Sequence, residues 1–330
     1  MIYLAVFIGS LVFTGLVRMY AIRKSIVDIP NDRSSHSIPT PRGGGLAIAI
    51  VWFGGLIFYF VQNNMDSSLF YALLAGLPLS FIGFADDVFN LKPGVRFLIQ
   101  FICAGLALWF LVGLQNIPIA TINFQLWYLL TPLAFIAIIW AINLFNFLDG
   151  IDGYIGLEIV FIGFAIYVLT GDQLGMLLAL STLGFLIWNW PKAKIFMGDV
   201  GSTLLGFTVA VLAIYHQNKE VSSIWVWLIL TAVFWFDATI TLLRRIKNKE
   251  KLSEAHRKHA YQRIVQSGFS HQKTTLLALA LNLIGFIFAL LALTYSSFAL
   301  LFLLGDLVLL FFVLNYIDKR KPFEYCVKAL

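Results

Sequence analysis

Charged residues are scarce in this chain of 330 residues. Asp, Glu, Lys and Arg make up only 12% of the sequence, hydrophobic residues make up 60%, and the mean hydropathy is +0.87. Soluble globular domains carry about 25% charged residues. The composition therefore excludes an ordinary soluble domain and predicts an integral membrane protein.

Cysteine is rarer still. The two cysteines are Cys103, inside an apolar run, and Cys326, near the end of the chain. Two cysteines in such different settings do not predict a disulfide, and a zinc site based on cysteine needs more ligands than these. The sequence thus excludes a disulfide-stabilised fold and a cysteine-based metal site.

Apolar runs long enough to cross a bilayer are, in contrast, abundant. A helix needs about 20 apolar residues to span the hydrocarbon core, where it satisfies its own backbone hydrogen bonds. We expect an all-α, polytopic transmembrane helical bundle that forms a single domain over residues 1–330. About eleven spans are expected, near residues 1–22, 44–62, 68–85, 97–114, 128–148, 154–170, 174–190, 202–216, 223–243, 274–293 and 298–317.

Basic residues gather in alternate connectors between these runs. Cytoplasmic loops retain Lys and Arg. With the N-terminus outside, the inward segments are 23–43, 86–96, 149–153, 191–201, 244–273 and the tail from 318, and only Lys219 falls in an outward connector. This skew predicts an outward N-terminus and a cytoplasmic active face. The net charge of +6 then suits phosphates and anionic lipids and does not indicate nucleic acid.

Two adjacent acids, Asp86 and Asp87, close the third apolar run. Neighbouring carboxylates at a membrane edge repel each other and lose hydration, and a divalent cation with phosphates can offset that cost. For an isolated pair of this kind, a solvated loop start is the favoured interpretation.

Four polar residues follow one another around the end of the fifth run, at Asn143, Asn146, Asp149 and Asp152. A helix places the first three on one face, and amides in an apolar span should face protein or water rather than lipid. A capped helix end explains one or two of them. Four polar groups in ten positions favour a functional site.

Asp199 immediately precedes another apolar run. Asp and Ser are good helix N-caps, so a simple cap is an alternative to a functional role. A helix N-terminus also attracts anions, and Gly198 and Gly201 would let a phosphate approach the backbone closely. These glycines favour a site.

His256, His259 and Arg263 are spaced so that a helix would place them on one side. Imidazole and guanidinium groups could hold a diphosphate. Zinc is disfavoured because no further Cys or His supplies the missing ligands. A solvated basic helix on the membrane surface is the alternative.

The first inward loop combines three prolines with glycines at residues 43–45, which predicts a fixed, non-helical path. Arg33, His36 and Arg42 add positive or titratable groups for phosphate binding. Two acids inside apolar runs, Asp237 and Glu158, are either functional or paired within the bundle.

Together these segments resemble the polyprenyl-phosphate N-acetylhexosamine-1-phosphate transferase family. The resemblance covers nearly the whole chain, and the motifs follow the family's order. The matching segments are residues 39–45, Asp86 with Asp87, Arg96 and Phe97 with Gln100, residues 143–153 and residues 196–202.

The resemblance implies a Mg²⁺-dependent reaction, with Mn²⁺ as a substitute. A UDP-N-acetylhexosamine donates its sugar-1-phosphate to undecaprenyl phosphate in the bacterial inner membrane, and UMP is released. It further implies a start to O-antigen or another cell-surface polysaccharide, and it allows for a homodimer.

The resemblance also implies roles for individual residues. Asp199 is the expected metal ligand. Asp86 and Asp87 are expected at the lipid phosphate, where one of them takes its proton, and Asp149 and Asp152 near the nucleotide and metal. The expected substrate ligands are Arg42, Arg96, Asn143, Asn146, His256, His259 and Arg263.

The histidine segment, His-Arg-Lys-His at residues 256–259, departs from two branches of the family. The peptidoglycan branch has consecutive histidines there, and common N-acetylglucosamine-1-phosphate transferases have His-x-His-His. This segment, with Asp237 and the Arg244-Arg245 pair, is closer to O-antigen initiators similar to enzymes that use UDP-N-acetylfucosamine or UDP-N-acetylquinovosamine. The donor is left open between N-acetylglucosamine and these 6-deoxy sugars.

Two other classes explain parts of the pattern. An intramembrane prenyltransferase pairs acidic loops with magnesium, but it needs Asp-x-x-x-Asp motifs that the spacing of Asp149 and Asp152 does not match. A transporter places polar residues near the bilayer midplane, often at broken helices. Here the polar residues gather at one surface, which favours the transferase.

Overall fold

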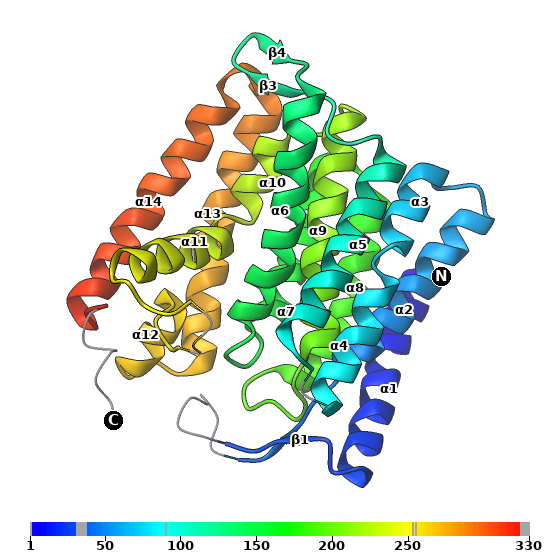
Figure 1. Ribbon diagram of the computed structural model, residues 1–330, viewed down its shortest axis with the longest axis vertical. Helices are drawn as coiled ribbons and strands as arrows, with labels where there is room; N and C mark the ends of the chain where they lie inside the picture. Colours follow the sequence, from blue (N-terminus) through cyan, green and yellow to red (C-terminus); the bar gives the residue numbers. More distant parts are fainter. Residues whose placement is uncertain (1, 31–37, 90, 253, 255, 324–330) are drawn as a thin grey trace.

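A computed structural model describes residues 2–30, 38–89, 91–252, 254 and 256–323. Arg33, His36 and Cys326 lie outside these residues. Within them the chain forms fourteen α-helices and only two small antiparallel sheets of two strands each (Figure 1). The predicted all-α fold class is confirmed.

Most of the helices are apolar and run along the long axis of the bundle. The helices are α1 (Ile2–Arg23), α2 (Gly45–Val61), α3 (Ser67–Leu74), α4 (Leu77–Phe89), α5 (Pro93–Leu111), α6 (Trp127–Leu148), α7 (Tyr154–Thr170), α8 (Gln173–Asn189), α9 (Asp199–Asn218), α10 (Ile224–Leu230), α11 (Ala232–Lys247), α12 (Ala260–Gln266), α13 (His271–Thr294) and α14 (Ala299–Arg320). The strands are β1 (Val27–Asp28), paired with β2 (Thr40–Pro41), and β3 (Ile117–Ile119), paired with β4 (Ile122–Phe124).

Helices that can cross a bilayer dominate the fold. Seven helical segments in the described part of the chain are long and apolar enough to do so, and the bent pair α10–α11 would make an eighth. The shorter helices α2, α7 and α8 are apolar as well. The chain is therefore a multi-pass membrane protein, and every expected apolar run is helical. The total of eleven spans and the outward N-terminus remain predictions.

The expected continuous span at residues 223–243 is wrong, because α10 and α11 are bent by 78° where they meet. Thr231 leaves helical geometry at the break, with φ −107° and ψ 7°. Its hydroxyl donates to the Trp227 carbonyl at 2.8 Å, which satisfies a backbone acceptor at the end of α10. As a result α11 lies across the bundle in Figure 1, beside α12.

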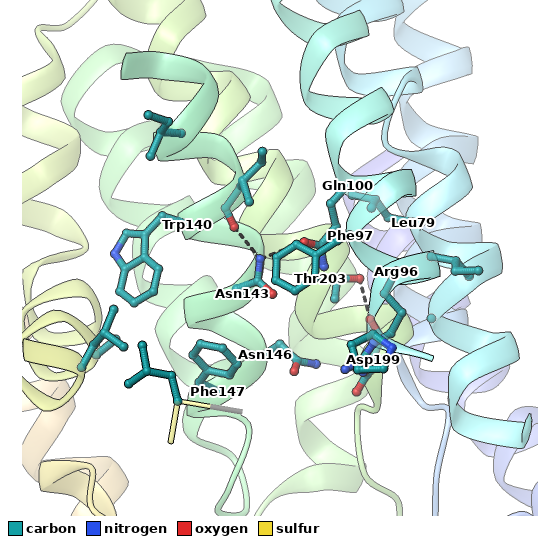
Figure 2. A pocket seen from close by; sticks show the side chains of 18 of the residues that line it. Leu79, Arg96, Phe97, Gln100, Trp140, Asn143, Asn146, Phe147, Asp199 and Thr203 are labelled. Atoms are coloured by element: carbon teal, nitrogen blue, oxygen red, sulfur yellow. Dashed lines mark hydrogen bonds and ion pairs between the residues drawn. The ribbon is translucent and has the colours of Figure 1, made fainter. Parts of the chain in front are cut away.

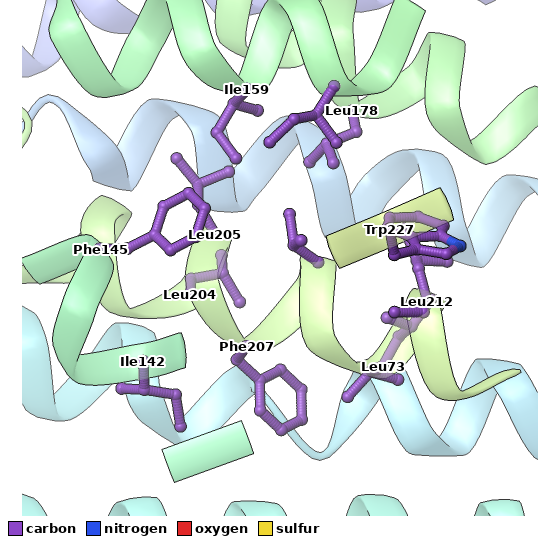
Figure 3. Packing of buried hydrophobic residues seen from close by; sticks show 14 of the residues in the cluster. Leu73, Ile142, Phe145, Ile159, Leu178, Leu204, Leu205, Phe207, Leu212 and Trp227 are labelled. Atoms are coloured by element: carbon purple, nitrogen blue, oxygen red, sulfur yellow. The ribbon is translucent and has the colours of Figure 1, made fainter. Parts of the chain in front are cut away.

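Helix α9 is the most enclosed of the long helices (Figure 3). A Cβ at Gly206 would lie 2.5 Å from the Ala141 carbonyl oxygen, and one at Gly201 would lie 2.9 Å from the Gly45 Cα. Small residues permit this close backbone packing, which drives helix association in lipid, where apolar burial alone gives little gain. Close contact with α2 and α6 therefore fixes the start of α9, where Asp199 lies.

The two ends of the bundle differ in character. The β3–β4 pair forms a hairpin and lies at one end, whereas β1, α12 and the end of α4 lie at the other (Figure 1). Glu158 of α7 accepts a hydrogen bond from Asn282 of α13 inside the bundle. Of the two roles expected for Glu158, a functional one or pairing within the bundle, the structure shows the pairing.

Candidate active site

The proline- and glycine-rich segment before α2 holds the segment before α9 in place. The Gly44 and Gly45 N–H groups donate to the carbonyls of Phe196 and Met197 at 2.9 and 2.8 Å. The Phe196 N–H in turn donates to the Pro41 carbonyl at 2.8 Å. A Cβ at Gly45 would lie 2.2 Å from the Gly201 nitrogen, so only glycine permits this approach. These glycines therefore position Asp199 through the backbone.

Asp87 reaches the start of α9 from the last turn of α4. Its Oδ1 accepts a hydrogen bond from the Asp199 N–H at 3.3 Å, whereas its buried Oδ2 has no hydrogen-bond partner. Gly198 has a φ of +74°, and a Cβ there would lie 2.2 Å from that Oδ2. Glycine at 198 is thus required both for its backbone conformation and for the space that Asp87 occupies.

Asp86 points to a different partner. Its Oδ2 lies 2.6 Å from Nη1 of Arg96, and its Oδ1 accepts from the Leu91 N–H at 2.7 Å. The same Arg96 nitrogen lies 3.0 Å from Asp199 Oδ2 (Figure 2). The two adjacent acids therefore have different environments: Asp86 is paired with a cation, and Asp87 keeps a free oxygen.

Asp149 joins this cluster from the end of α6. Burial, with the nearby Asp199 and Asp87 carboxylates, raises the pKa of Asp149 to about 7, although Arg42 and the Gly198 N–H oppose the rise. Each added negative charge is costly here, because the carboxylates share a poorly hydrated region. The structure thus brings Arg42, Asp87, Asp149 and Asp199 together, as the sequence suggested.

The chemistry of this cluster fits an open magnesium site better than a closed one. In the described residues, no group of three or more His, Cys, Asp or Glu side chains could enclose a metal ion. Mg²⁺ usually takes only one or two protein carboxylates and completes its shell with water and substrate phosphates. Asp199, beside the unpaired Oδ2 of Asp87, provides such a donor set.

A cavity of about 770 Å³ opens beside Asp199, between α4, α5, α6, α9 and α11 (Figure 2). Asn143 Nδ2 donates to Gln100 Oε1 at 2.8 Å, and Asn146 Nδ2 donates to Ser202 Oγ at 3.2 Å. Both asparagines line the cavity, so they face protein and cavity rather than lipid, as expected. The rest of its lining is largely apolar and includes Leu79, Ile82, Phe97, Ile136, Ile139, Trp140, Phe147 and Leu242.

His256 and His259 also line the cavity. The expected helix that would carry both histidines on one side is wrong. Helix α12 begins only at Ala260, because Asp237 accepts the N–H groups of Ala260 and Tyr261 at 2.7 and 3.2 Å. The two imidazole rings are 5.0 Å apart. Burial, reinforced by His259 and nearby cations, lowers the pKa of His256 to about 3. His256 is therefore a neutral hydrogen-bonding group.

The structure does not bring Arg263 to the cavity. Its Nη1 lies 2.6 Å from Asp318 Oδ1 and 2.8 Å from the Lys321 carbonyl, and the side chain is 1% exposed. Arg244 pairs with the same carboxylate at 2.7 Å. Asp318 is therefore the link between α11, α12 and α14, and Arg263 is part of that link instead of a substrate ligand.

Asp152 also lies away from the lining of the cavity. Its carboxylate accepts the Ala193 N–H at 3.2 Å and lies 3.3 Å from His271 Nδ1. Its backbone carbonyl accepts the Thr275 hydroxyl at 3.3 Å. Asp152 thus joins the connection between α6 and α7 to the segment that follows α8 and to α13, and its place near the nucleotide stays a prediction.

Arg245 is a cavity residue to which sequence reasoning gave no role. Its guanidinium donates to the carbonyls of Lys251 and Glu254 at 2.6 and 3.0 Å, and it pairs with Glu250 at 3.2 Å. It thereby shapes the segment that leads to His256. The adjacent Arg244 and Arg245 were visible in the sequence, but their spacing does not tell which one turns inward.

Comparison with known proteins agrees with these motifs. A family model described as "Glycosyl transferase family 4" matches residues 69–217. A "Probable undecaprenyl-phosphate N-acetylglucosaminyl 1-phosphate transferase" of Bacillus subtilis (strain 168) is 32% identical over 97% of this chain and 93% of its own length. The "Undecaprenyl-phosphate alpha-N-acetylglucosaminyl 1-phosphate transferase" of Yersinia pestis is 30% identical over 86% and 81%.

A mycobacterial relative differs in the lipid that its name states. The "Decaprenyl-phosphate N-acetylglucosaminephosphotransferase" of Mycobacterium leprae (strain TN) is 30% identical over 80% of this chain and 76% of its own length. The relatives from Bacillus subtilis and Yersinia pestis cover 97% and 86% of this chain, well beyond the segment that the family model matches. The chain therefore belongs to glycosyl transferase family 4, the family of membrane-bound polyprenyl-phosphate sugar-1-phosphate transferases that its motifs resemble.

Proposed function

We propose that this protein transfers an N-acetylhexosamine-1-phosphate from a UDP-sugar to undecaprenyl phosphate and releases UMP. The observation that carries the proposal is the cluster of Asp87, Asp149 and Asp199 with Arg96 at the polar edge of a largely apolar cavity. Such a cavity can take a molecule with an anionic head and an isoprenoid tail. The names of the relatives support a polyprenyl phosphate as that molecule.

Asp199 would hold magnesium, or manganese in its place, and water and substrate phosphates would complete the shell of the ion. Bound there, the ion would supply charge screening between two phosphate groups and stabilise the transition state of phosphoryl transfer. Arg96 and Arg42 add fixed positive charge for the anionic substrates. This charge offsets the repulsion between a lipid phosphate and a nucleotide diphosphate.

In the proposed reaction an oxygen of the lipid phosphate attacks the β-phosphorus of the donor. The bond between that phosphorus and the bridging oxygen breaks, and UMP leaves with that oxygen. Asp87 is better placed than Asp86 to take the proton of the lipid phosphate. Both oxygens of Asp86 already accept hydrogen bonds, from Leu91 and Arg96, whereas Oδ2 of Asp87 is free. We prefer this direct attack to a covalent aspartyl-phosphate intermediate.

The donor sugar would lie toward His256, His259 and Arg245, on the side of the cavity opposite α5. The neutral His256 can donate one hydrogen bond to a sugar hydroxyl or acetamido group without adding charge. We propose UDP-N-acetylglucosamine as the first donor to test, in line with the relatives' names, followed by the 6-deoxy sugars that the histidine segment suggested. Initiation of O-antigen or another surface polysaccharide at the cytoplasmic face of the inner membrane, by a homodimer, completes the proposal.

The test is UMP release by the purified protein in nanodiscs with Mg²⁺ and undecaprenyl phosphate. UDP-N-acetylglucosamine, UDP-N-acetylgalactosamine, UDP-N-acetylfucosamine and UDP-N-acetylquinovosamine are supplied separately. We expect UMP with at least one donor, only when the lipid is present, and a loss of about 10³-fold or more in Asp199→Asn, since its carboxylate acts on the transition state. Folded protein that releases no UMP with any donor would contradict the proposal.

A further inference from the structure

A second cavity, of about 1250 Å³, lies between α5 and α6 near the β3–β4 end of the bundle. Its lining includes Gly105 and Leu108 of α5, with Pro132 and Phe135 of α6. None of its lining residues in the described part of the chain is charged. Such a cavity offers nothing to hold a phosphate and suits a neutral, apolar ligand.

The two cavities are consecutive parts of one seam between α5 and α6. Ile136 lines both of them. On α5, the lining continues along one helix face from Phe97 and Gln100 in the first cavity to Gly105 and Leu108 in the second. The seam thus runs from the acidic cluster toward the opposite end of the bundle.

Gly105 lies at the point where the seam passes from one cavity to the other. It is exposed, and a Cβ there would meet only the edge of the Phe135 ring, at 3.9 Å. Phe135 packs edge-on against Phe101, with ring centroids 5.3 Å apart. The missing side chain at Gly105 therefore leaves room beside this aromatic pair.

We propose that the second cavity binds the distal part of the acceptor's polyprenyl tail, so that one lipid follows the α5–α6 seam across most of the bilayer. This inference rests on the proposed function, because it assumes that the lipid phosphate lies at Arg96. One leaflet is only about 15 Å deep, and an undecaprenyl chain is much longer. The 19 residues of α5 offer a path of about 28 Å.

The far end of the seam is polar, which suits a tail of limited length. The far lining consists of Gln115, Asn116 and Gln125 beside Trp109 and Trp127. Amide side chains at this end are poor partners for further isoprene units, whereas the rings of the tryptophans pack well against them. Binding along the seam selects the acceptor by packing and shape, because transfer from lipid into an apolar groove brings little hydrophobic gain.

The first test compares Gly105→Leu with Gly54→Leu. Both place leucine at an exposed helical glycine, and a Cβ at Gly54 would meet nothing within 4 Å. Glycine costs about 1 kcal/mol in a helix relative to alanine, so neither change should weaken its helix. We expect Gly105→Leu to raise the KM for undecaprenyl phosphate by about tenfold, which corresponds to a loss of only about 1.4 kcal/mol in the free energy of binding. Gly54→Leu should leave it unchanged.

Geranyl phosphate separates a blocked seam from a damaged active site. Gly105 lies nine residues beyond Arg96 on α5, a rise of about 13 Å, which exceeds the length of a tail of two isoprene units. The KM for geranyl phosphate, and that for the UDP-sugar, should therefore be equal in wild type and Gly105→Leu. An unchanged KM for undecaprenyl phosphate in Gly105→Leu would overturn the inference while leaving the proposed function intact. A wild-type protein that is inactive with undecaprenyl phosphate would instead refute the proposed function.

Photocrosslinking tests the inference without blocking the seam. Benzoylphenylalanine replaces Trp109, which lines the second cavity and is 80% exposed, or Phe311 of α14, which is 52% exposed and outside it. We expect radiolabelled undecaprenyl phosphate to label the Trp109 variant, with competition by unlabelled lipid, and to label the Phe311 variant at least fivefold less. Equal labelling of both would show that bulk lipid fills the cavity, and would overturn the inference.

Discussion

Replacement of Gly198 by alanine should abolish most of the activity while leaving the bundle folded. An added Cβ would lie 2.2 Å from Asp87 Oδ2 and 2.9 Å from its Cγ. Relief of this overlap needs a displacement of about 1 Å, and a misplacement of that size can cost about 10²-fold in rate. With a φ of +74° and a ψ of 176°, Gly198 also lies in a region that is essentially restricted to glycine, which adds roughly 1–3 kcal/mol of backbone strain for an L-residue.

Gly171→Ala is the control for a positive φ at a helix end. Gly171 has a φ of +76° and a ψ of 5°, at the end of α7, and a Cβ there meets nothing within 4 Å. Both variants should lose stability from backbone strain, measured as the melting temperature of the purified protein, and Gly198→Ala should lose more, because the left-handed helical conformation of Gly171 is open to L-residues and the conformation of Gly198 is not. Only Gly198→Ala should also lose about 10²-fold in kcat, measured by UMP release.

Binding of Mn²⁺, followed by electron paramagnetic resonance without substrate, adds a readout that does not depend on turnover. We expect weaker Mn²⁺ binding in Gly198→Ala and unchanged binding in Gly171→Ala. Wild-type kcat and Mn²⁺ affinity in Gly198→Ala would refute the placement of Asp87 at the reacting phosphates. Equal losses in both variants would show that a positive φ at a helix end, not the contact with Asp87, is responsible.

Three further changes test other parts of the site. Because the pKa of Asp149 is raised to about 7, its protonation should stabilise the metal-free protein at low pH, and this contribution should be lost as pH rises to 7. Thermal unfolding between pH 5 and 8 should show this slope, and Asp149→Asn should reduce it. Arg263→Met removes a charged hydrogen bond to Asp318 and should lower the free energy of unfolding by roughly 1.5–3 kcal/mol. The KM for the UDP-sugar should stay unchanged. A raised KM in a variant of unchanged stability would contradict this structural role. Because the pKa of His256 is lowered to about 3, its imidazole should not titrate between pH 5 and 8 and should add no ionisation to the pH profile of kcat/KM. If the wild-type profile shows an ionisation near pH 6 that His256→Gln removes, the imidazole is not neutral.

The helices were predictable because the bilayer leaves an apolar run little other choice of structure. The run at 202–216, one of the shortest expected spans, became the 20-residue helix α9, since polar residues such as Asp199 and Asn218 extend it at both ends. The break at Thr231 was not predictable in the same way. It depends on where α11 packs across the bundle, and no Pro or Gly marks it in the sequence.

The site was predictable where a residue acts through its own chemistry and spacing. Asn143 and Asn146 had to face away from lipid, and both line the cavity. The roles of Asp152 and Arg263 depended instead on partners distant in sequence: His271 lies beside Asp152, and Asp318 pairs with Arg263. Spacing alone cannot identify such partners, because an acid or a base has the same local signature whether it binds a substrate or another side chain.

In the proposed reaction, sugar and β-phosphate move together onto the lipid. This transfer can be followed with UDP-N-acetylglucosamine labelled with ³²P at the β-phosphorus, with Mg²⁺, undecaprenyl phosphate and the purified protein. We expect the label in the lipid fraction as a diphosphate-linked sugar, in equal amount to the UMP released. Label that remains with the nucleotide as UDP while the sugar alone reaches the lipid would contradict the proposed reaction.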